Sequence, residues 1–499
     1  MESSRNVTEI RRQMSALTSD QWMRERELRM ISLFKEAAVN VPAYADFLSQ
    51  AHINPDQVNT YEDFKNVPFV NKKNYLTQYP IESLCWNGKI ADASVYTATS
   101  GSTGTPFYFL RTEQLDWQYS VLLEEFLERN DILENSPTLV VVCFGMGLWI
   151  GGLITYKGFE IAAIRNKYQL SLITPGFNKK EIFSILEKLA PKYKQTILAG
   201  YPPFIKDILD EAEALSIPLK NLNIKTLFAA EAISEKYRDY IAEKIGSKNI
   251  FRDIMSIYGS ADIGAMATET TSATLIKRLA RDNEQLFSEL FSPIKKTPTL
   301  AQFNPHFINF EEQDGQLLLT GNNAMPLIRY AIGDSGGVFS FAHASKTLST
   351  FGINLHEEAA KAGISSFVQE LPFVYVYERI DLSTSFYGLL IYPEWIKAAL
   401  YDEAVSGSIT GKFTMLTKSD EHENQYLEIN IEMKKEVDTS DILKSKLSES
   451  IVQSLLKHSS EYREIEKGLG DFARPRIVLW PAEDPLFFKP GVKQKWVEK

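Results

Sequence analysis

Short apolar runs alternate with amphipathic segments through the middle of the chain. Runs of a few apolar or β-branched residues predict buried strands, whereas apolar residues three or four positions apart predict helices. The expected strands cover residues 139–144, 196–199, 225–229 and 315–320, and the expected helices cover residues 115–126, 182–189, 204–214 and 236–245. This alternation predicts an α/β fold with parallel strands.

The two ends of the chain have other patterns. Residues 1–90 predict mainly helix, with helical apolar spacing over 22–39, and are expected to form a lid or brace. Residues 271–305 are rich in Lys, Arg and Thr and weakly periodic, which predicts an insertion. Beyond the apolar run 373–377, the expected elements are strands at 388–392, 412–416, 426–433 and 476–479 and helices from Pro393 and over 439–457.

These patterns predict two domains. The large multi-lobed body covers residues 1–377, a hinge covers 378–382, and a small mobile α+β domain covers 383–499. Strand and helix signals of both parts are complete enough for each to bury a core of its own.

One segment, residues 137–156, has no charged residue and is long enough for a membrane span. Its middle holds four glycines, including Gly147 and Gly151, and its first part is short and β-branched. We therefore interpret it as a buried strand, a glycine-rich turn and a second apolar element, and we expect no membrane span.

The composition and charge of the chain argue against several classes of function. The chain has 499 residues, 44% of them hydrophobic, and 54 basic against 64 acidic residues give a net charge of −10, so we expect no nucleic-acid partner. Only two cysteines and six scattered histidines are present, which argues against a disulfide framework or a structural metal site. The first residues lack the pattern of a signal peptide, and together these features predict a cytoplasmic protein.

The most informative motif is Thr-Ser-Gly-Ser-Thr-Gly-Thr-Pro at residues 99–106, just before a strand-like segment. Glycines let successive backbone N–H groups converge on an anion, and hydroxyl groups add further donors. The motif therefore predicts a phosphate-binding loop, although it lacks the Gly-Lys-Ser/Thr end of a Walker A loop. By itself such a run also fits an ordinary turn.

Further motifs follow in order along the chain. They are Ala-Ala-Glu at 229–231, Tyr-Gly-Ser-Ala-Asp at 258–262, Pro-Leu-Ile-Arg-Tyr-Ala-Ile-Gly-Asp at 326–334, Arg-Ile-Asp at 379–381 and Gly-Val-Lys-Gln-Lys at 491–495. In this order they resemble the adenylate-forming superfamily and, within it, the phenylacetate-CoA ligase-like branch. Val-Pro-Ala-Tyr at 41–44 and Val-Pro-Phe at 67–69 are similar to that branch's N-terminal signature, so the resemblance covers nearly the whole chain.

The resemblance implies a nucleotide site. Ser100, Gly101, Ser102, Thr103 and Gly104 would hold the β and γ phosphates of ATP. A further set would line the adenine pocket, with the ring of the tyrosine facing the base: Ala230, Glu231, Ser256, Tyr258 and Gly259.

It also implies the residues that carry the chemistry. Asp334 would accept hydrogen bonds from the ribose hydroxyls, which suits a carboxylate with two acceptor oxygens. Asp262 stands where the family has the Glu that binds Mg²⁺, one methylene shorter. Arg379 lies at the hinge, and Lys493 is the candidate for a mobile lysine that meets the reacting carboxylate and the α-phosphate.

Simpler interpretations of the same residues stay open. Asp334 could be a loop carboxylate, Asp262 could cap a turn, and Glu231 could cap the helix that follows it. Lys493 could belong to a solvated basic tail with its neighbour Lys495. The chain also departs from the family pattern, for instance with Ser256 where an acidic residue is common.

The resemblance implies the function of an acid–thiol ligase. ATP and Mg²⁺ would activate a small carboxylic acid, aryl or of medium length, to an acyl-adenylate, and coenzyme A would then take the acyl group. Transfer to an amine or a carrier protein is the first alternative, and a non-catalytic nucleotide-binding protein is the second. The sequence selects neither the acid nor the oligomeric state, and a homodimer stays open.

Overall fold

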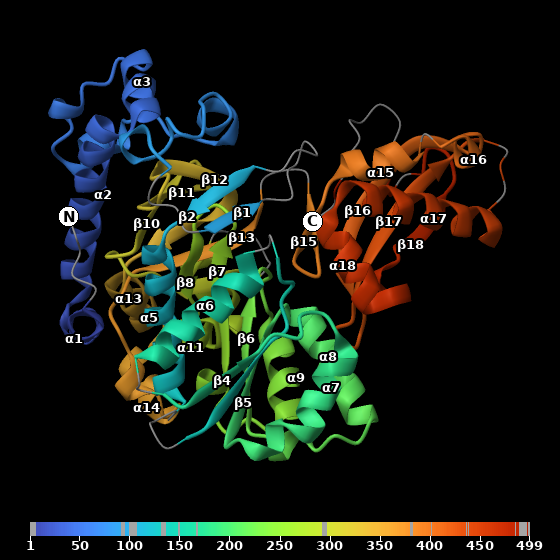
Figure 1. The fold of residues 1–499 in the computed structure, drawn as a ribbon, viewed down its shortest axis with the longest axis horizontal. Helices are drawn as coiled ribbons and strands as arrows, with labels where there is room; N and C mark the ends of the chain where they lie inside the picture. Colours follow the sequence, from blue (N-terminus) through green and yellow to red (C-terminus); the bar gives the residue numbers. More distant parts are fainter. Residues whose placement is uncertain are drawn as a thin grey trace.

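The computed structural model describes residues 6–90, 95–98, 107–130, 136–147, 150–165, 168–291, 297–379, 383–400, 402–435, 437, 439–484, 486–488 and 497. It has mixed α/β structure with a large body and a smaller carboxyl-terminal unit, which confirms the predicted fold class (Figure 1). The prediction of domain limits falls partly on residues 380–382, outside the described residues, and stays a prediction.

One long sheet forms the centre of the body, with the strand order β10-β11-β12-β13-β9-β8-β7-β6-β5-β3-β4. The strands from β4 to β7 are parallel, as the sequence predicts, and the pairs from β7–β8 to β10–β11 are antiparallel. The strands are β3 (Thr138–Val142), β4 (Leu170–Ile173), β5 (Gln195–Gly200), β6 (Ile224–Ala229), β7 (Ile254–Ser260), β8 (Gly264–Thr268), β9 (Thr299–Gln302), β10 (Ile308–Gln313), β11 (Gln316–Gly321), β12 (Leu327–Phe339) and β13 (Phe373–Arg379).

Helices cover both faces of the parallel part. Side chains of a strand alternate between faces, so Val140 and Val142 pack with one group of helices while Leu139 and Val141 pack with the other. On the first face lie α5 (Glu113–Arg129) and α6 (Ile150–Ile164), and on the second lie α7 (Lys179–Lys188), α8 (Pro202–Ala214) and α9 (Glu235–Ile245). The described part of the segment 137–156 thus contains the buried strand β3 and the start of α6, in agreement with the expected strand and second apolar element.

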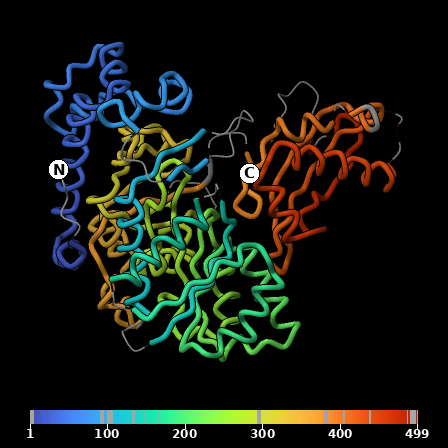
Figure 2. Tube along the Cα trace, viewed as in Figure 1, coloured from blue at the N-terminus to red at the C-terminus, as the bar shows by residue number. Residues whose placement is uncertain are grey.

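The amino-terminal part is helical, as predicted, and packs along the antiparallel end of the sheet (Figure 2). Arg26 ties it there, because its guanidinium donates to the carbonyl oxygen of Phe310 on β10. Its helices are α1 (Val7–Ala16), α2 (Ser19–Asn40), α3 (Pro42–Gln50) and α4 (Tyr61–Lys65), followed by the short π-helix η2 (Lys72–Leu76) and the hairpin of β1 (Val95–Ala98) and β2 (Tyr108–Arg111).

The predicted insertion at 271–305 was wrong. This segment forms α11 (Thr271–Arg281), α12 (Glu284–Leu290) and β9, and β9 is an internal strand of the main sheet. The pattern was misleading because α11 buries polar residues, among them Lys277, which is buried between carboxylates. Lys277 Nζ lies 2.7 Å from Glu269 Oε1 and 3.2 Å from Glu235 Oε1, and Arg238 pairs with both carboxylates.

The carboxyl-terminal unit has its own small sheet of order β16-β17-β18 beside a two-stranded hairpin. Every strand and helix predicted for it is present, with limits shifted by a few residues. The elements are β14 (Thr384–Phe386), β15 (Leu389–Ile391), α15 (Pro393–Leu400), α16 (Glu403–Ser406), β16 (Ile409–Ser419), β17 (Gln425–Met433), α17 (Asp441–His458), α18 (Ser460–Leu469) and β18 (Arg476–Trp480). Below, this unit is called the small domain.

The remaining helices are short. In the body they are α10 (Ile250–Asp253), α13 (Phe341–Thr350), α14 (Leu355–Lys361), η1 (Pro55–Gln57), η3 (Trp86–Gly88), η4 (Ala190–Lys192), η5 (Leu219–Asn221) and η6 (Ser365–Phe367), and in the small domain η7 (Gly470–Ala473). Within the described residues, none of these helices or the longer ones has the length and hydrophobicity to cross a bilayer.

The buried charge cluster gives the first prediction. Lys277 is 1% exposed, so Lys277→Met removes a cation that the two buried carboxylates need. We expect the free energy of unfolding to fall by about 3 kcal/mol in urea denaturation. The surface pair Lys361–Glu358 is the control, and Lys361→Met should cost less than about 0.5 kcal/mol. Equal losses would show that the cluster does not stabilise the body.

Candidate functional site

The predicted site residues gather where β6 and β7 end. These parallel neighbours are in register from Thr226 with Ile254 to Ala229 with Ile257, so the residues that follow β6 lie beside the last residues of β7. Ala230 and Glu231 come directly after β6, and Ser256, Tyr258 and Gly259 lie in β7. The carboxyl ends of parallel strands are where open α/β sheets bind ligands.

Tyr258 connects this edge to Asp334 on β12. The tyrosine hydroxyl donates a 2.6 Å hydrogen bond to Asp334 Oδ2, and the carboxylate is 8% exposed. The ring of Tyr258 packs near Phe310, with centroids 5.9 Å apart. Asp334 lies in the strand β12 and not in a loop, and this hydrogen bond fixes the orientation of its carboxylate. Its proposed contact with ribose stays a prediction.

Asp262 lies in the turn between β7 and β8 and is 5% exposed. Its Oδ2 accepts a 2.6 Å hydrogen bond from the hydroxyl of Tyr330, and its Oδ1 lies 3.5 Å from Lys72 Nζ. Both partners come from distant parts of the chain, so the carboxylate does more than cap the turn, and its proposed contact with Mg²⁺ stays a prediction.

Sequence reasoning missed Lys72 and Tyr330. Lys72 opens η2, and its Nζ lies 5.5 Å from the ring centroid of Phe109 on β2. It therefore stands close to the strand that follows the predicted phosphate loop. A signal was present for both residues, because Lys72 comes three residues after the Val-Pro-Phe signature and Tyr330 lies inside the motif 326–334.

Glu231 turns its carboxylate to the small domain. Its Oε1 accepts hydrogen bonds from Ser385 Oγ and from the backbone N–H of Gly388, and its Oε2 accepts from Gln425 Nε2 at 2.8 Å. The alternative that Glu231 caps the next helix is wrong, because Ser234 is the N-cap of α9. Ala230 beside it has a φ of +75°, a backbone conformation that residues other than glycine rarely adopt.

The structure gives a local physical reason for two further predicted residues, Gly259 and Ser256. A Cβ on Gly259 would lie 2.9 Å from the carbonyl oxygen of Gly264, so the close approach of β7 and β8 needs glycine there. The hydroxyl of Ser256 is buried and has no hydrogen-bond partner in the described part of the chain. An unpaired buried hydroxyl beside Tyr258 is consistent with a ligand contact at this edge.

The remaining candidates lie outside the described residues. These are the loop residues Ser100, Gly101, Ser102, Thr103 and Gly104, together with Lys493. Arg379 is described for its backbone only, which ends β13 opposite Asp334. This pairing places the backbone of Arg379 beside Asp334, and the predicted hinge role of Arg379 stays a prediction.

A small cavity of about 10 Å³ lies where the body meets the small domain. The body side holds Gly145, Phe177 and Tyr201. Tyr201 packs edge to face on Phe144, with centroids 5.0 Å apart. In this arrangement of the domains the cavity has room for about one water molecule.

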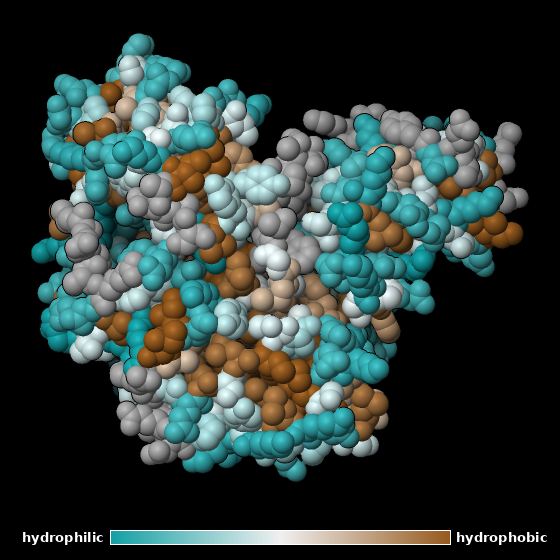
Figure 3. All heavy atoms as spheres, in the orientation of Figure 1, coloured by the Kyte–Doolittle hydropathy of each residue, from teal (hydrophilic) through white to brown (hydrophobic). Residues whose placement is uncertain are grey.

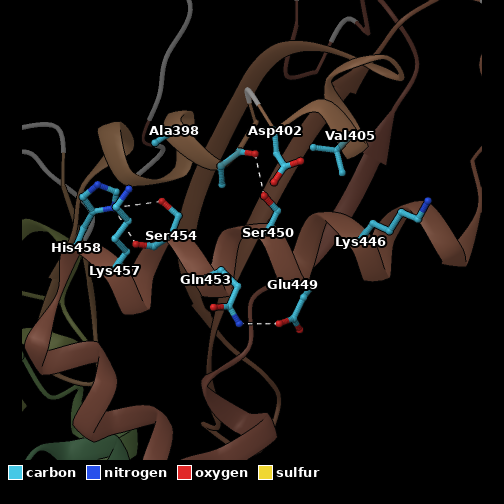
Figure 4. Close-up of a pocket in the computed structure, with 11 residues that line it drawn as sticks. Ala398, Asp402, Val405, Lys446, Glu449, Ser450, Gln453, Ser454, Lys457 and His458 are labelled. Atoms are coloured by element: carbon cyan, nitrogen blue, oxygen red, sulfur yellow. Dashed lines mark hydrogen bonds between the residues drawn. The ribbon is translucent and has the colours of Figure 1, made fainter.

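A second, open groove of about 600 Å³ crosses the small domain between α15 and α17 (Figure 4). Its lining includes Asp402, Lys446, Gln453 and His458. The His458 ring turns back on its own helix, with Nδ1 2.8 Å from the carbonyl oxygen of Ser454. The groove is separate from the predicted site residues.

Comparison with known proteins agrees with these observations. No family model matches the chain. Phenylacetate-coenzyme A ligase of Thermus thermophilus is 23% identical over 314 residues, which cover 62% of this chain and 63% of the relative. The enzyme of the same name from Escherichia coli is 23% identical over 307 residues, with 60% and 63% covered. The alignments thus span a little under two thirds of the relatives' length.

Solved structures match over a greater length. A crystal structure of 2-hydroxyisobutyryl-CoA ligase in complex with 2-HIB-AMP and CoA, in the thioesterification state, has a TM-score of 0.61 at 16% identity, covering 98% of this chain and 91% of that one. This chain has the adenylate-forming fold. The predicted resemblance to the superfamily and its phenylacetate-CoA ligase-like branch is confirmed. An open conformation of the same ligase has a TM-score of 0.52 at 15% identity, covering 98% and 94% of the two chains.

Asp262 provides the second prediction. Asp262→Ala leaves the buried hydroxyl of Tyr330 without its acceptor, which should lower the free energy of unfolding by about 1 to 3 kcal/mol. Asp262→Asn keeps an acceptor oxygen for Tyr330, so it should unfold close to the wild type in urea denaturation. Loss of stability in the Asn variant equal to that in the Ala variant would contradict the role assigned to the hydrogen bond.

Proposed function

We propose that this chain is an AMP-forming acid–thiol ligase. It would join a carboxylic acid to the α-phosphate of ATP, release pyrophosphate, and transfer the acyl group from the adenylate to the thiol of coenzyme A. The observation that supports this proposal most directly is the site at the ends of β6 and β7. There, Tyr258 orients the carboxylate of Asp334 within a fold of adenylate-forming enzymes.

The described residues suit the nucleoside half of ATP. Asp334 would accept hydrogen bonds from the ribose hydroxyls, in the orientation that Tyr258 fixes. The backbone of Ala230 and Glu231 and the ring of Tyr258 would border the base, with Ser256 Oγ as a free donor at the edge. Ser100 to Gly104, next to β2, would hold the phosphates.

Joining two anions requires positive charge at the reacting atoms. Lys72 supplies a cation on the body, held between Asp262 and the ring of Phe109. Lys493 on the small domain is proposed as the second one, which would approach only when that domain moves over the nucleotide.

Asp262 is the proposed contact for Mg²⁺. No cluster of three or more His, Cys, Asp or Glu side chains suited to a metal occurs in the described ranges. Proteins commonly hold Mg²⁺ through one or two carboxylates together with substrate phosphates, so a single carboxylate such as Asp262 suits this ion. When bound, the ion would offset the charge of the departing pyrophosphate.

The acid is expected to be aryl or of medium length, because Phe177 and Tyr201, with Phe144 packed on Tyr201, line the body side of the domain junction. Transfer to an amine or a carrier protein stays the alternative for the second step. The cytoplasmic location, which rests on the small number of cysteines and on the first residues lacking a signal-peptide pattern, also stays a prediction.

The experiment is a panel of carboxylic acids, with ATP, Mg²⁺ and CoA, in which AMP and acyl-CoA are quantified together by chromatography. We expect equal amounts of AMP and thioester for at least one aryl or medium-length acid. Hydroxylamine or a carrier protein in place of CoA tests the alternative acceptors. AMP formed at the same rate with and without CoA, and no thioester, would contradict the proposal.

Asp334 gives a sharper test of the nucleotide site. Asp334→Ala should weaken ATP binding by roughly 5- to 100-fold, because ribose hydroxyls would lose an acceptor worth about 1 to 3 kcal/mol. The loss should be much smaller for 2′,3′-dideoxy-ATP, which has no hydroxyls for Asp334 to contact. Tyr258→Phe is the matched control for orientation alone. Titration calorimetry measures all of these affinities, and equal losses for both nucleotides would show that Asp334 has a structural role.

A further inference from the structure

The small domain docks on the body through the turn between β14 and β15. At the turn, Gly388 has a φ of +77°, and a Cβ on it would lie 2.5 Å from a ring carbon of Tyr201. The domain rises beside the body, and the molecular face is notched between it and the amino-terminal helices (Figure 3). The turn therefore packs directly against the body, and the contacts around it help to hold the domain.

Glu231 is the main acceptor on the body side of this junction. It receives the hydroxyl of Ser385, the backbone N–H of Gly388 and the amide of Gln425. Gln425 is itself oriented, because its Oε1 accepts a 2.7 Å hydrogen bond from the N–H of Tyr387. Hydrogen bonds to a charged acceptor are stronger than neutral ones, so this carboxylate favours docking.

Asp207 on α8 adds a second contact to the same turn. The hydroxyl of Tyr387 donates to Asp207 Oδ2 at 2.9 Å, and Lys179 Nζ lies 3.9 Å from the same oxygen. Burial outweighs these partners and raises the pKa of the Asp207 carboxyl to about 6. Nearby, Lys206 Nζ donates to Asn424 Oδ1 at 2.6 Å.

Glu461 faces the same junction from the first turn of α18, but no donor in the described residues pairs with its carboxylate. It lines the small cavity opposite Tyr201 and Phe177, and in the described residues its carboxylate has neither a hydrogen bond nor an ion pair. The titratable groups that face it there are the hydroxyls of Tyr201 and Tyr387, and neither carries positive charge. Burial raises the pKa of the Glu461 carboxyl to about 7.

We propose that the two carboxylates act in opposite directions on domain docking: Glu231 holds the small domain on the body, and Glu461 opposes it. Their balance sets how often the domain releases. Because Glu231 directly follows Ala230 at the edge of the nucleotide site, release of the domain also frees a residue of that site. The docking itself needs neither substrate nor the proposed reaction.

The direction of the pH effect follows from the burial of Glu461. An acid with a raised pKa in the docked state prefers to be protonated there, so docking is favoured at low pH, weakens as pH rises from the ordinary Glu value of 4.5 to about 7, and levels off above that pH. The pKa of the Asp207 carboxyl, about 6, places most of its titration below pH 6.5. Between pH 6.5 and 8, Glu461 should dominate the change.

The test measures docking directly by single-molecule energy transfer without substrates. Cysteines at Leu215 on the body and Ile442 on the small domain, which are 60% and 71% exposed, accept the dyes. The native Cys85 and Cys143 are at most 1% exposed and should not react. The variants are Glu231→Gln, Gln425→Ala and Glu461→Gln, with Lys236→Ala as the control that removes the exposed interdomain pair with Glu423.

We expect Glu231→Gln to lower the ratio of docked to undocked molecules about tenfold or more, since it loses the charge and sets its amide against that of Gln425. Gln425→Ala should change the ratio in the same direction. Glu461→Gln should raise the ratio about tenfold at pH 8 and remove most of its change between pH 6.5 and 8. Lys236→Ala should alter it less than about twofold.

Two results would overturn the proposal. The first is a ratio within twofold of the wild type in both Glu231→Gln and Gln425→Ala. The second is a lower ratio in Glu461→Gln at pH 8. Failure of the acid panel would leave these measurements unaffected, so the docking proposal and the proposed reaction fail separately.

Discussion

Hydrogen bonds from tyrosine hydroxyls to buried aspartates hold the functional parts of this protein in place. Tyr258 holds Asp334, Tyr330 holds Asp262, and Tyr387 reaches Asp207. A buried carboxylate loses much of its hydration, and a hydroxyl donor restores part of that energy and fixes the direction of the remaining lone pairs. Each bond also joins segments far apart in the sequence, so the site exists only when the whole body has folded.

The same junctions explain why a site at the ends of β6 and β7 can be linked to a separate small domain. Glu231 leaves β6 next to Ala230 and places its carboxylate under the turn at Gly388. A few residues therefore border both the predicted nucleotide pocket and the domain junction. In such an arrangement, domain position and ligand state can influence each other through one short segment, without a long pathway across the body.

The periodic parts of the chain were predictable because their pattern is local. The strands at 139–144 and 225–229 and the helices at 115–126 and 236–245 appeared as expected, since their apolar residues alone specify which face is buried. The helix α11 was missed because Lys277 is buried through charge pairing, which no local pattern reveals. Lys72 and Tyr330 lie near or inside sequence motifs, but the motifs alone do not single them out. Their importance lies in a contact with Asp262, and that contact depends on tertiary structure.

The central claim is that the site activates a carboxylic acid with ATP. The most direct measurement is exchange of labelled pyrophosphate into ATP in the absence of any acyl acceptor, with and without the acid that performs best in a binding screen. The account predicts exchange that requires both the acid and Mg²⁺, because forming the adenylate is reversible and needs no thiol. Binding of ATP without acid-dependent exchange for any acid would contradict it and would favour a nucleotide-binding protein without this chemistry.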